Sequence, residues 1–316
     1  MRRALITGVG GQDGTLLAEK LLEDGWEVHG TTRSSDATVP LGVSVHVADF
    51  GDPSAVAPVV AQTRPDVLFN LAGVSSVAAS WEQPVSTAVV NGASVVSLLE
   101  AIKADSTLST RFVQASSSEI FGDALQSPQN EETTVAPTSP YGAAKAFAHT
   151  MVGIYRNRGI FASSAILYNH ESVIRPQSFV MRKITRGAAE IALGQRSILH
   201  LGDLDVRRDW GWAPDYVDAL IAIANANNPA DYIVATGRSH SVRDIVSTAF
   251  EAAGISDWRP FVRVDADYHR PADAREMLGD PALISSQLGW HPSVGFEEMV
   301  QRMVENDLSS LQGARR

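Results

Sequence analysis

The sequence contains no cysteine, which excludes disulfides, thiolate nucleophiles and cysteine-based zinc sites. Its eight histidines are scattered, and none has a metal-binding spacing such as H-E-x-x-H, so nothing in the sequence supports metal catalysis. Basic residues are also few: 26 stand against 36 acidic ones, the formal net charge is −10, and no run of Lys or Arg interrupts this balance. The charge argues against nucleic acid and anionic membranes as partners.

Long apolar runs are missing at the start of the chain. The opening "MRRALITGVG" has two arginines but an apolar stretch too short for a signal peptide or a membrane helix. Low-complexity tracts and repeats of 20–50 residues are missing as well. What is present is 44% hydrophobic content over 316 residues, enough for a sizeable core and two domains. We expect a compact cytoplasmic enzyme or binding protein.

The first half of the chain alternates short β-branched runs with segments whose apolar residues have helical spacing. The predicted strands are 4–7, 27–32, 43–49, 66–72, 111–116 and 161–168. Near-continuous apolar strands that alternate with helices are typical of a parallel sheet covered on both faces. The pattern predicts an α/β fold, a Rossmann-type doubly wound parallel sheet.

After Asn169 the alternation loosens. The pattern there predicts helices near 179–193, 214–227 and 295–308, a short strand near 197–201, and a further strand and helix within 231–253. We infer a smaller, mostly helical substrate domain over the ends of the strands. The predicted division is 1–168, with about 205–238 returning to it, against 169–204 and 239–316.

The motif "TGVGGQDG" follows the first predicted strand and opens a helix. Gly8, Gly11 and Gly14 allow a tight turn and let the backbone approach a pyrophosphate, which then lies at the positive end of the helix. A plain glycine-rich turn is the alternative. The position at the first strand–helix junction favours dinucleotide binding.

The choice of dinucleotide is usually visible at the end of the second strand. An acidic residue there would hold the ribose hydroxyls of NAD, but this chain has Arg33 in "HGTTRSS". A cation flanked by hydroxyls suits a 2′-phosphate, which favours NADP, and a solvated surface arginine is the alternative. Asp49, at the end of the third strand, could touch the adenine or simply cap the strand.

Tyr141 and Lys145 lie four residues apart in "SPYGAAKAFAHT". Ser139 suits a helix N-cap and Pro140 the first helical position, so the phenol and the ammonium share one face of a helix. A nearby ammonium would lower the phenol's pKa and let it act as a base on an alcohol. A surface pair without function is the alternative.

The stretch "QASSSEIFG" ends the fifth predicted strand with three serines and a carboxylate. Polar groups are tolerated there because ligands bind outside the carboxyl ends of strands in open α/β sheets. Ser117 would hydrogen-bond the hydroxyl that Tyr141 deprotonates, and Glu119 would be a second proton-transfer group. Ile120 and Phe121 would pack beneath it. Capping of a strand end is the alternative for the serines.

Taken together, these motifs resemble the extended short-chain dehydrogenase/reductases. Longer segments, "QASSSEIFG", "ILYNHES" and "LGDLDVRRDWGWAPDYVDA" among them, are similar to GDP-mannose 4,6-dehydratases from residue 3 to about residue 308. The resemblance implies NADP in the first domain and a GDP-sugar in the second. The product would be a GDP-4-keto-6-deoxy-sugar.

The resemblance also implies a role for each matching residue. Tyr141 would take the proton of the 4-hydroxyl, Lys145 would hold the nicotinamide ribose, Glu119 would remove the hydrogen on carbon 5, and Ser117 would stabilise the oxyanion. The expected cofactor contacts are Gly8, Gly11, Gln12, Asp13, Gly14, Arg33, Asp49, Phe50, Leu71, Ala72, Gly73, Tyr141, Lys145, His170 and Arg175. The expected substrate contacts are Ser75, Ser118, Asn169, Lys183, Arg208 and Arg270.

The chain departs from the family at positions expected to line the sugar side of the site. Val173 and Ile174 replace a proline and an arginine, Met181 replaces a small polar residue, and Val74 and Ser76 replace Gln and His. A different hexose, or an epimerase that acts through a 4-keto sugar, therefore stays open. Epimerases of the superfamily commonly lack a carboxylate at the position of Glu119, and non-catalytic relatives tend to lose the Tyr/Lys pair.

The predicted assembly is a homodimer. The segment 34–41 is shorter than the family's arm, which reaches a neighbouring subunit and builds a tetramer. We expect the dimer to form through the helices near 84–103 and 139–158.

Overall fold

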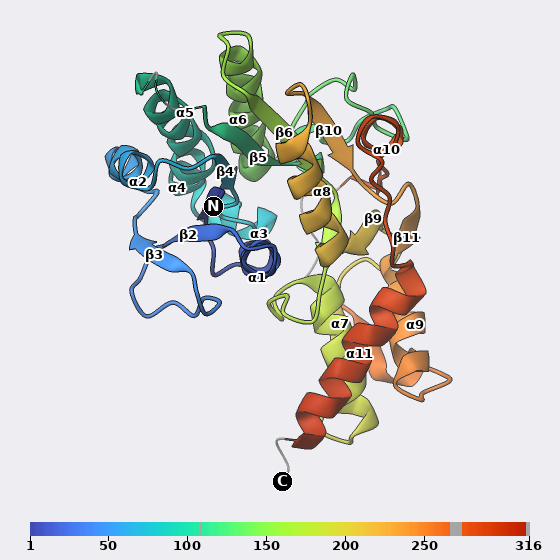
Figure 1. The fold of residues 1–316 in the computed structure, drawn as a ribbon. Helices are drawn as coiled ribbons and strands as arrows, with labels where there is room; N and C mark the ends of the chain where they lie inside the picture. The colour runs from blue at the N-terminus through green and yellow to red at the C-terminus, as the bar shows by residue number, and fades with distance from the viewer. Residues whose placement is uncertain (106, 108, 266–273, 314–316) are drawn as a thin grey trace.

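A seven-stranded parallel sheet forms the larger part of the protein in a computed structural model, which describes residues 1–105, 107, 109–265 and 274–313 (Figure 1). In spatial order β10-β6-β5-β4-β1-β2-β3, every neighbouring pair is parallel. The strands are β1 (Arg3–Thr7), β2 (Glu27–Thr32), β3 (Ser44–Val47), β4 (Val67–Asn70), β5 (Arg111–Ser117), β6 (Ala162–Leu167) and β10 (Asp231–Val234). The predicted doubly wound fold is confirmed.

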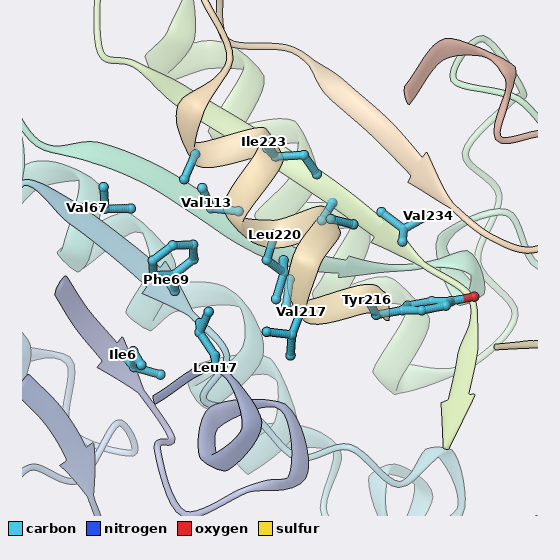
Figure 2. Packing of buried hydrophobic residues seen from close by; sticks show 14 of the residues in the cluster. Ile6, Leu17, Val67, Phe69, Val113, Tyr216, Val217, Leu220, Ile223 and Val234 are labelled. Atoms are coloured by element: carbon cyan, nitrogen blue, oxygen red, sulfur yellow. The ribbon is translucent and has the colours of Figure 1, made fainter. Parts of the chain in front are cut away.

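Helices cover both faces of this sheet. On one face lie α1 (Gln12–Glu23), α8 (Ala213–Asn225) and α10 (Ala282–Leu288), and on the other lie α2 (Val56–Thr63), α5 (Ser94–Ala104) and α6 (Pro140–Arg156). Figure 2 shows the apolar side of α8, with Val217 and Leu220, over Phe69 and Val113 of the strands. Strands buried on both faces explain the near-continuous apolar runs of the sequence.

Short elements join these layers. They are η1 (Pro53–Ala55), α3 (Val77–Glu82), α4 (Pro84–Ala88), the π-helix η2 (Val89–Ala93) and the 3₁₀ helix η3 (Ser118–Ile120). The start of α6 follows from its sequence: the Ser139 hydroxyl accepts the Gly142 N–H at 3.0 Å, and Pro140 occupies the first turn. This cap fixes the position of the helix that carries Tyr141 and Lys145.

The remaining elements form a smaller lobe, mostly helical, as predicted. Its helices α7 (Val180–Ala192), α9 (Val242–Ala252) and α11 (Phe296–Gly313) pack together (Figure 1). One small sheet contains β7 (Asn169–Glu171), β9 (Arg207–Trp212), β11 (Ser239–Ser241) and β13 (Glu276–Met277), and a second pairs β8 (Leu199–Leu201) with β12 (Val262–Val264), which follows η4 (Arg259–Phe261). The lobe has an apolar core of its own.

The chain crosses between the lobes more than once. Within the predicted returning segment 205–238, α8 and β10 belong to the layers of the main sheet, whereas β9 pairs in the small sheet. Later in the chain, Ile284 of α10 and Trp290 pack in the core beside α8. The numerical domain boundaries stay a prediction.

A buried ion pair ties α7 to α11 in the smaller lobe. Arg182 donates to Asp307, whose side chain is fully buried, and the Thr185 hydroxyl donates to the same carboxylate at 3.2 Å. Both partners lie on inward faces of their helices. The pair therefore fixes how the two helices pack.

One helical stretch among the described residues, Pro84–Ala104, is long and apolar enough to cross a membrane by length and composition. It comprises α4, η2 and α5, and less than half of its apolar window, 44%, is buried. The buried side packs on the main sheet with Val95, Leu98 and Leu99. The other side carries exposed apolar residues, among them Val85.

Candidate active site

The predicted site residues follow the carboxyl ends of the main-sheet strands. Parallel strands present these ends at one edge of the sheet, so the segments that follow them gather there. The residues from Gly8 to Gly14 follow β1, Arg33 follows β2, Asp49 and Phe50 follow β3, Leu71 to Gly73 follow β4, and Ser118 and Glu119 follow β5. Residues far apart in sequence thus come together, as the polar strand ends predicted.

The glycine-rich turn after β1 is packed too closely for side chains. Gly8 has φ +70°, and a Cβ there would lie 2.9 Å from the Cα of Ala72; a Cβ on Gly14 would lie 2.4 Å from the Gly8 carbonyl oxygen. No side chain caps the first turn of α1, which begins at Gln12. A helix N-terminus without a side-chain cap suits phosphate oxygens, so this turn fits a dinucleotide.

The residues expected at the adenosine end differ in exposure. Arg33 is exposed directly after β2, while Phe50 is buried in the core. The exposed Asp49 accepts the Gly51 N–H at 2.8 Å, which is the strand-end cap that the sequence left open. Arg33 is thus an exposed cation in the segment that follows β2.

Tyr141, Ser117 and Glu119 meet where β5 ends and α6 begins. Hydrogen bonding by the Ser117 hydroxyl lowers the pKa of the Tyr141 phenol and the Glu119 carboxylate raises it, so both groups act on the same phenol. Ile120 and Phe121 are fully buried beneath them, as predicted. The three groups expected to handle protons are thus neighbours in space.

The ionisation of the phenol differs from the prediction. Burial raises the pKa of Tyr141 to about 12; the Glu119 and Asp13 carboxylates raise it further, against the Ser117 hydrogen bond and the Arg175 charge, which lower it. Lys145 is not among these causes. The predicted lowering of this pKa was therefore wrong for the free protein, because burial is the largest cause and it raises the pKa.

Lys145 lies over the Tyr141 ring and is held there by a backbone carbonyl. Its ammonium donates to the Ala115 carbonyl at 2.8 Å and lies 5.8 Å from the centre of the Tyr141 ring. Burial lowers the pKa of Lys145 to about 8, with the Asp13 carboxylate opposing this shift. The side chain can therefore lose its proton near neutral pH.

Asp13 and His170 join the glycine-rich turn to β7. His170 Nε2 lies 3.0 Å from Asp13 Oδ2, and His170 Nδ1 lies 2.7 Å from the Tyr168 carbonyl. Burial opposes ionisation of Asp13, but the His170 charge and hydrogen bonds from His170 and Gln12 lower its pKa to about 2. Burial likewise opposes the charge of His170, yet Asp13 raises its pKa. A charged pair at this junction is the consistent description.

Glu171 is a buried carboxylate that the sequence analysis missed. Its Oε2 lies 3.5 Å from Arg175 Nε, and the Arg175 guanidinium lies 3.5 Å above the Phe179 ring. Burial raises the pKa of Glu171, against the charge of Arg175. Because Arg175 also lowers the pKa values of Tyr141 and Asp13, its charge reaches the same site.

The predicted substrate contacts are distributed around this site. Asn169 lies on β7, Ser118 is buried in η3, Ser75 is exposed before α3, and Lys183 lies on α7. Arg208 on β9 is buried, and its guanidinium donates to the Arg207 and Ala274 carbonyls at 2.7 and 2.8 Å. Arg270 lies outside the described residues. Within the described residues, no cluster of three or more His, Asp or Glu could hold a metal ion.

Two further residues shape the site without an obvious sequence signal. Asn91, in the π-helix η2, accepts the Val74 N–H at 2.8 Å and donates to the Val74 carbonyl at 2.9 Å, which fixes the loop after β4. The Ser80 hydroxyl accepts the Tyr141 N–H at 3.1 Å. By contrast, Met181 is fully buried in the core of the smaller lobe, so the expectation that it lines the sugar side was wrong.

The family of the chain follows from its similarity to known proteins. The GDP-mannose 4,6 dehydratase family model matches residues 5–303. The chain is 40% identical to the GDP-mannose 4,6-dehydratase of Sinorhizobium fredii, over 99% of this chain and 98% of the relative, and 41% identical to GDP-mannose 4,6 dehydratase 2 of Arabidopsis thaliana, over 96% and 86%. The chain belongs to the GDP-mannose 4,6-dehydratase family.

A solved structure extends the likeness to the whole fold. The UDP-glucose 4-epimerase of Thermus thermophilus, in complex with NAD, has a TM-score of 0.84 and 26% identity over 96% of this chain and 98% of that one. In the dehydratase-family chain, "NHES" and "RDWG" lie on adjacent strands, with Asn169 opposite Trp210 in the β7–β9 pair. Two motifs that carried the resemblance therefore lie side by side in the small sheet.

Proposed function

We propose that the protein converts GDP-mannose into GDP-4-keto-6-deoxymannose with NADP as a cofactor that is regenerated in each turnover. The observation that carries the proposal is the meeting of Ser117, Glu119 and Tyr141 at the end of β5. A phenol, a hydroxyl and a carboxylate in one place match a reaction that oxidises one carbon and removes water from the next two.

The proposed reaction is redox-neutral. Tyr141 accepts the proton of the 4-hydroxyl while hydride leaves carbon 4, and Ser117 stabilises the oxygen that becomes the ketone. Glu119 removes the proton on carbon 5, which the ketone has made acidic, and gives it to the departing 6-hydroxyl, which leaves as water. Return of the hydride to carbon 6 would be accompanied by a proton taken up at carbon 5 from solvent, and Tyr141 would release its proton to solvent. The bound nicotinamide supplies the acceptor and donor of hydride and, when oxidised, a positive charge that favours the phenolate.

NADP is the proposed form of the cofactor because Arg33 is an exposed cation after β2. Replacing it tests this choice directly. Arg33→Ala should raise the apparent Kd for NADP about tenfold or more and leave that for NAD nearly unchanged, as measured by fluorescence titration. Equal effects on both dinucleotides would contradict the assignment to a 2′-phosphate.

The activity is tested by incubating the protein with NADP and GDP-mannose and identifying the product by NMR and mass spectrometry. The expected product has lost water, and in D₂O it carries deuterium at carbon 5. Glu119→Gln should lose dehydration while keeping cofactor binding. Deuterium incorporation without loss of the 6-hydroxyl would favour the alternative, an epimerase acting through a 4-keto sugar, which the family membership does not favour.

The substrate contacts remain part of this proposal. Asn169 and Arg208 come from the paired strands β7 and β9, and Lys183 lies on α7. Cations suit a pyrophosphate in an acidic protein. A panel of GDP-, UDP-, CDP- and dTDP-sugars tests which base and which hexose the protein accepts. Val74, Ser76 and the half-exposed Ile174, which differ from the family's residues, are proposed to influence the choice of hexose.

The assembly that we propose is a homodimer. An open groove of about 380 Å³ lies between α4, η2 and α6, and it is lined by Pro84, Ala88, Ala93, Pro140, Ala143, Ala144 and Phe147. Phe147, 49% exposed, stands beside small residues that could receive the same side chain of a second copy. This arrangement also accounts for the unburied side of Pro84–Ala104.

Phe147→Glu should convert the dimer into a monomer in light-scattering chromatography. Leu125→Glu, at a fully exposed apolar residue elsewhere, is the matched control and should leave the dimer intact. Dimers in both variants would contradict this interface. Cytoplasmic localisation stays a prediction.

A further inference from the structure

A row of buried polar side chains crosses the main sheet one layer below the site. Thr7 of β1 faces Asn70 of β4, Asn70 faces Gln114 of β5, and Gln114 faces Ser164 of β6 in the strand register. All four are at most 1% exposed. By strand alternation they share a face with Leu5, Leu68, Phe112 and Ala162, which pack in the cluster formed with α2, α5 and α6.

The hydrogen bonds of Thr7 determine the direction of every other hydrogen bond in the row. The Thr7 hydroxyl accepts the N–H groups of Leu71 and Ala72, both at 3.0 Å, so its two lone pairs are used and its hydrogen must point elsewhere. It donates to Asn70 Oδ1 at 2.6 Å. Asn70 therefore presents its amide nitrogen to Gln114, donating to Oε1 at 2.8 Å.

The row ends at the carbonyl that holds Lys145. With Oε1 already used, Gln114 presents Nε2, which donates to the Ala115 carbonyl at 2.8 Å. The Lys145 ammonium donates to the same oxygen, also at 2.8 Å. A carbonyl oxygen has two lone pairs, so Gln114 takes one and leaves the other for Lys145.

We propose that Gln114 is a positioning residue for Lys145: its carboxamide, oriented by Asn70 and Thr7, shares the Ala115 carbonyl and so weakens and directs the hold on the ammonium. The role in turnover rests on the proposed function of Lys145. The competition at the carbonyl does not, because it is a property of the free protein. Thr7 also accepts hydrogen bonds from the backbone of the loop after β4. The row therefore connects that loop to Lys145.

Because Lys145 shares its hydrogen-bond acceptor with Gln114, its ammonium loses a proton more easily. Hydrogen bonding to an ammonium favours its charged form, and a second donor on the same oxygen weakens that bond. This agrees with a pKa of about 8 for Lys145, for which burial is the main cause. Other ionisable groups also surround the site: Asp13, His170, Glu119, Arg175 and Tyr141. Among them, Asp13 raises the pKa of Lys145.

The test is a titration of Lys145 by NMR in the free protein. The chain has four lysines, Lys20, Lys103, Lys145 and Lys183, so ¹³C-labelled lysine gives few signals, and Lys145→Arg identifies the one of interest. Gln114→Met removes the competing donor without adding charge. The Lys145 transition should move about one pH unit higher, because the carbonyl then serves the ammonium alone.

A second variant keeps the proposal testable if Gln114→Met does not fold. Asn70→Asp offers only acceptors, so the Gln114 amide must turn its nitrogen toward residue 70 and its oxygen toward Lys145; the transition should again move to higher pH. Ser164→Ala is the matched control, since Ser164 lies in the same row but its hydroxyl has no hydrogen-bond partner among the described residues. It should titrate as the wild type does.

Turnover gives a separate readout. Gln114→Met should lower kcat about tenfold with little change in KM, and its pH profile should move to higher pH with the Lys145 transition. A Lys145 transition that stays in place in both Gln114→Met and Asn70→Asp would overturn the proposal. Full activity in Lys145→Met would instead contradict the proposed function of Lys145 and leave the NMR result standing.

Discussion

Below the strand ends of the main sheet, Lys145 is buried against a neutral carbonyl, whereas in the smaller lobe Arg182 is buried against the carboxylate of Asp307. The ammonium has a pKa lowered to about 8 by burial, so its charge can change near neutral pH. The guanidinium of Arg182 is paired with Asp307 and joins α7 to α11. Burial without a charged partner prepares a group for chemistry, and burial with one serves packing.

The largest effect on activity is expected at Tyr141, in the main-sheet lobe. Tyr141→Phe removes only the hydroxyl that Ser117 contacts, and kcat should fall about 10³-fold while cofactor binding and thermal stability change little. Steady-state kinetics and fluorescence titration measure this. Tyr155→Phe is the control: Tyr155 lies farther along α6, its hydroxyl donates to Glu100 of α5, and activity should be unchanged. A kcat of Tyr141→Phe within tenfold of the wild-type value would contradict the role of Tyr141 as the base in the reaction.

The next effect concerns the smaller lobe. Asp307→Asn leaves Arg182 buried without its ionic partner and should lower the free energy of unfolding by about 3 kcal/mol in urea titrations. Glu298→Gln is the control on the same helix, because its partner Arg302 is exposed; it should cost less than about 0.5 kcal/mol. Equal costs in the two variants would show that the Arg182 pair does not hold the helices.

The Asp13–His170 pair is expected to contribute less to stability than the Arg182–Asp307 pair. The pKa of Asp13 is lowered from 3.8 to about 2, so its contribution is complete above about pH 4 and is lost as the pH falls toward 2. His170 has a raised pKa, so its contribution is present below its unfolded value of 6.5 and is lost as the pH rises through the folded value.

Asp13→Asn should therefore lower the free energy of unfolding at pH 6 by about 2 kcal/mol, and the difference from the wild type should shrink toward pH 2. The His170 transition, followed by NMR, should move to lower pH in the variant because the carboxylate that raises it is gone. A pH-independent difference would mean that the pair acts through packing and not through charge.

The smallest effect is expected at Ser80. Ser80→Ala removes the acceptor of the Tyr141 N–H and should cost about 1 kcal/mol in stability and a few-fold in kcat. Ser86→Ala, at an exposed serine of α4, should change neither. A loss of stability without any loss of kcat would separate the start of α6 from the position of the phenol.

Much of the main-sheet lobe followed from local patterns. The strands were predicted because buried parallel strands need continuous apolar runs, and "ASSSE" was assigned to a site because polar groups interrupt such a run at its end. The start of α6 followed from Ser139 and Pro140. The smaller lobe offered only loose periodicity, so its site residues came from the family resemblance and not from spacing.

Other features could not be predicted because they depend on partners distant in sequence. Asn70 and Gln114 look like the polar ends of two strands until the register places them side by side. Asn91 lies within an ordinary helical pattern, and its bonds to Val74 depend on the π-helix. The pKa of Tyr141 was predicted in the wrong direction because spacing along a helix shows a nearby lysine but not the depth of burial.

The sequence by itself determined the parallel sheet, the dinucleotide-binding turn and the position of Tyr141 on its helix, because each depends on neighbours within a few residues. The tertiary structure alone decided which buried groups keep a variable charge. That decision depends on burial and on acceptors brought from other strands, such as the carbonyl of Ala115 under Lys145, and on carboxylates brought from another helix, such as Asp307 beside Arg182.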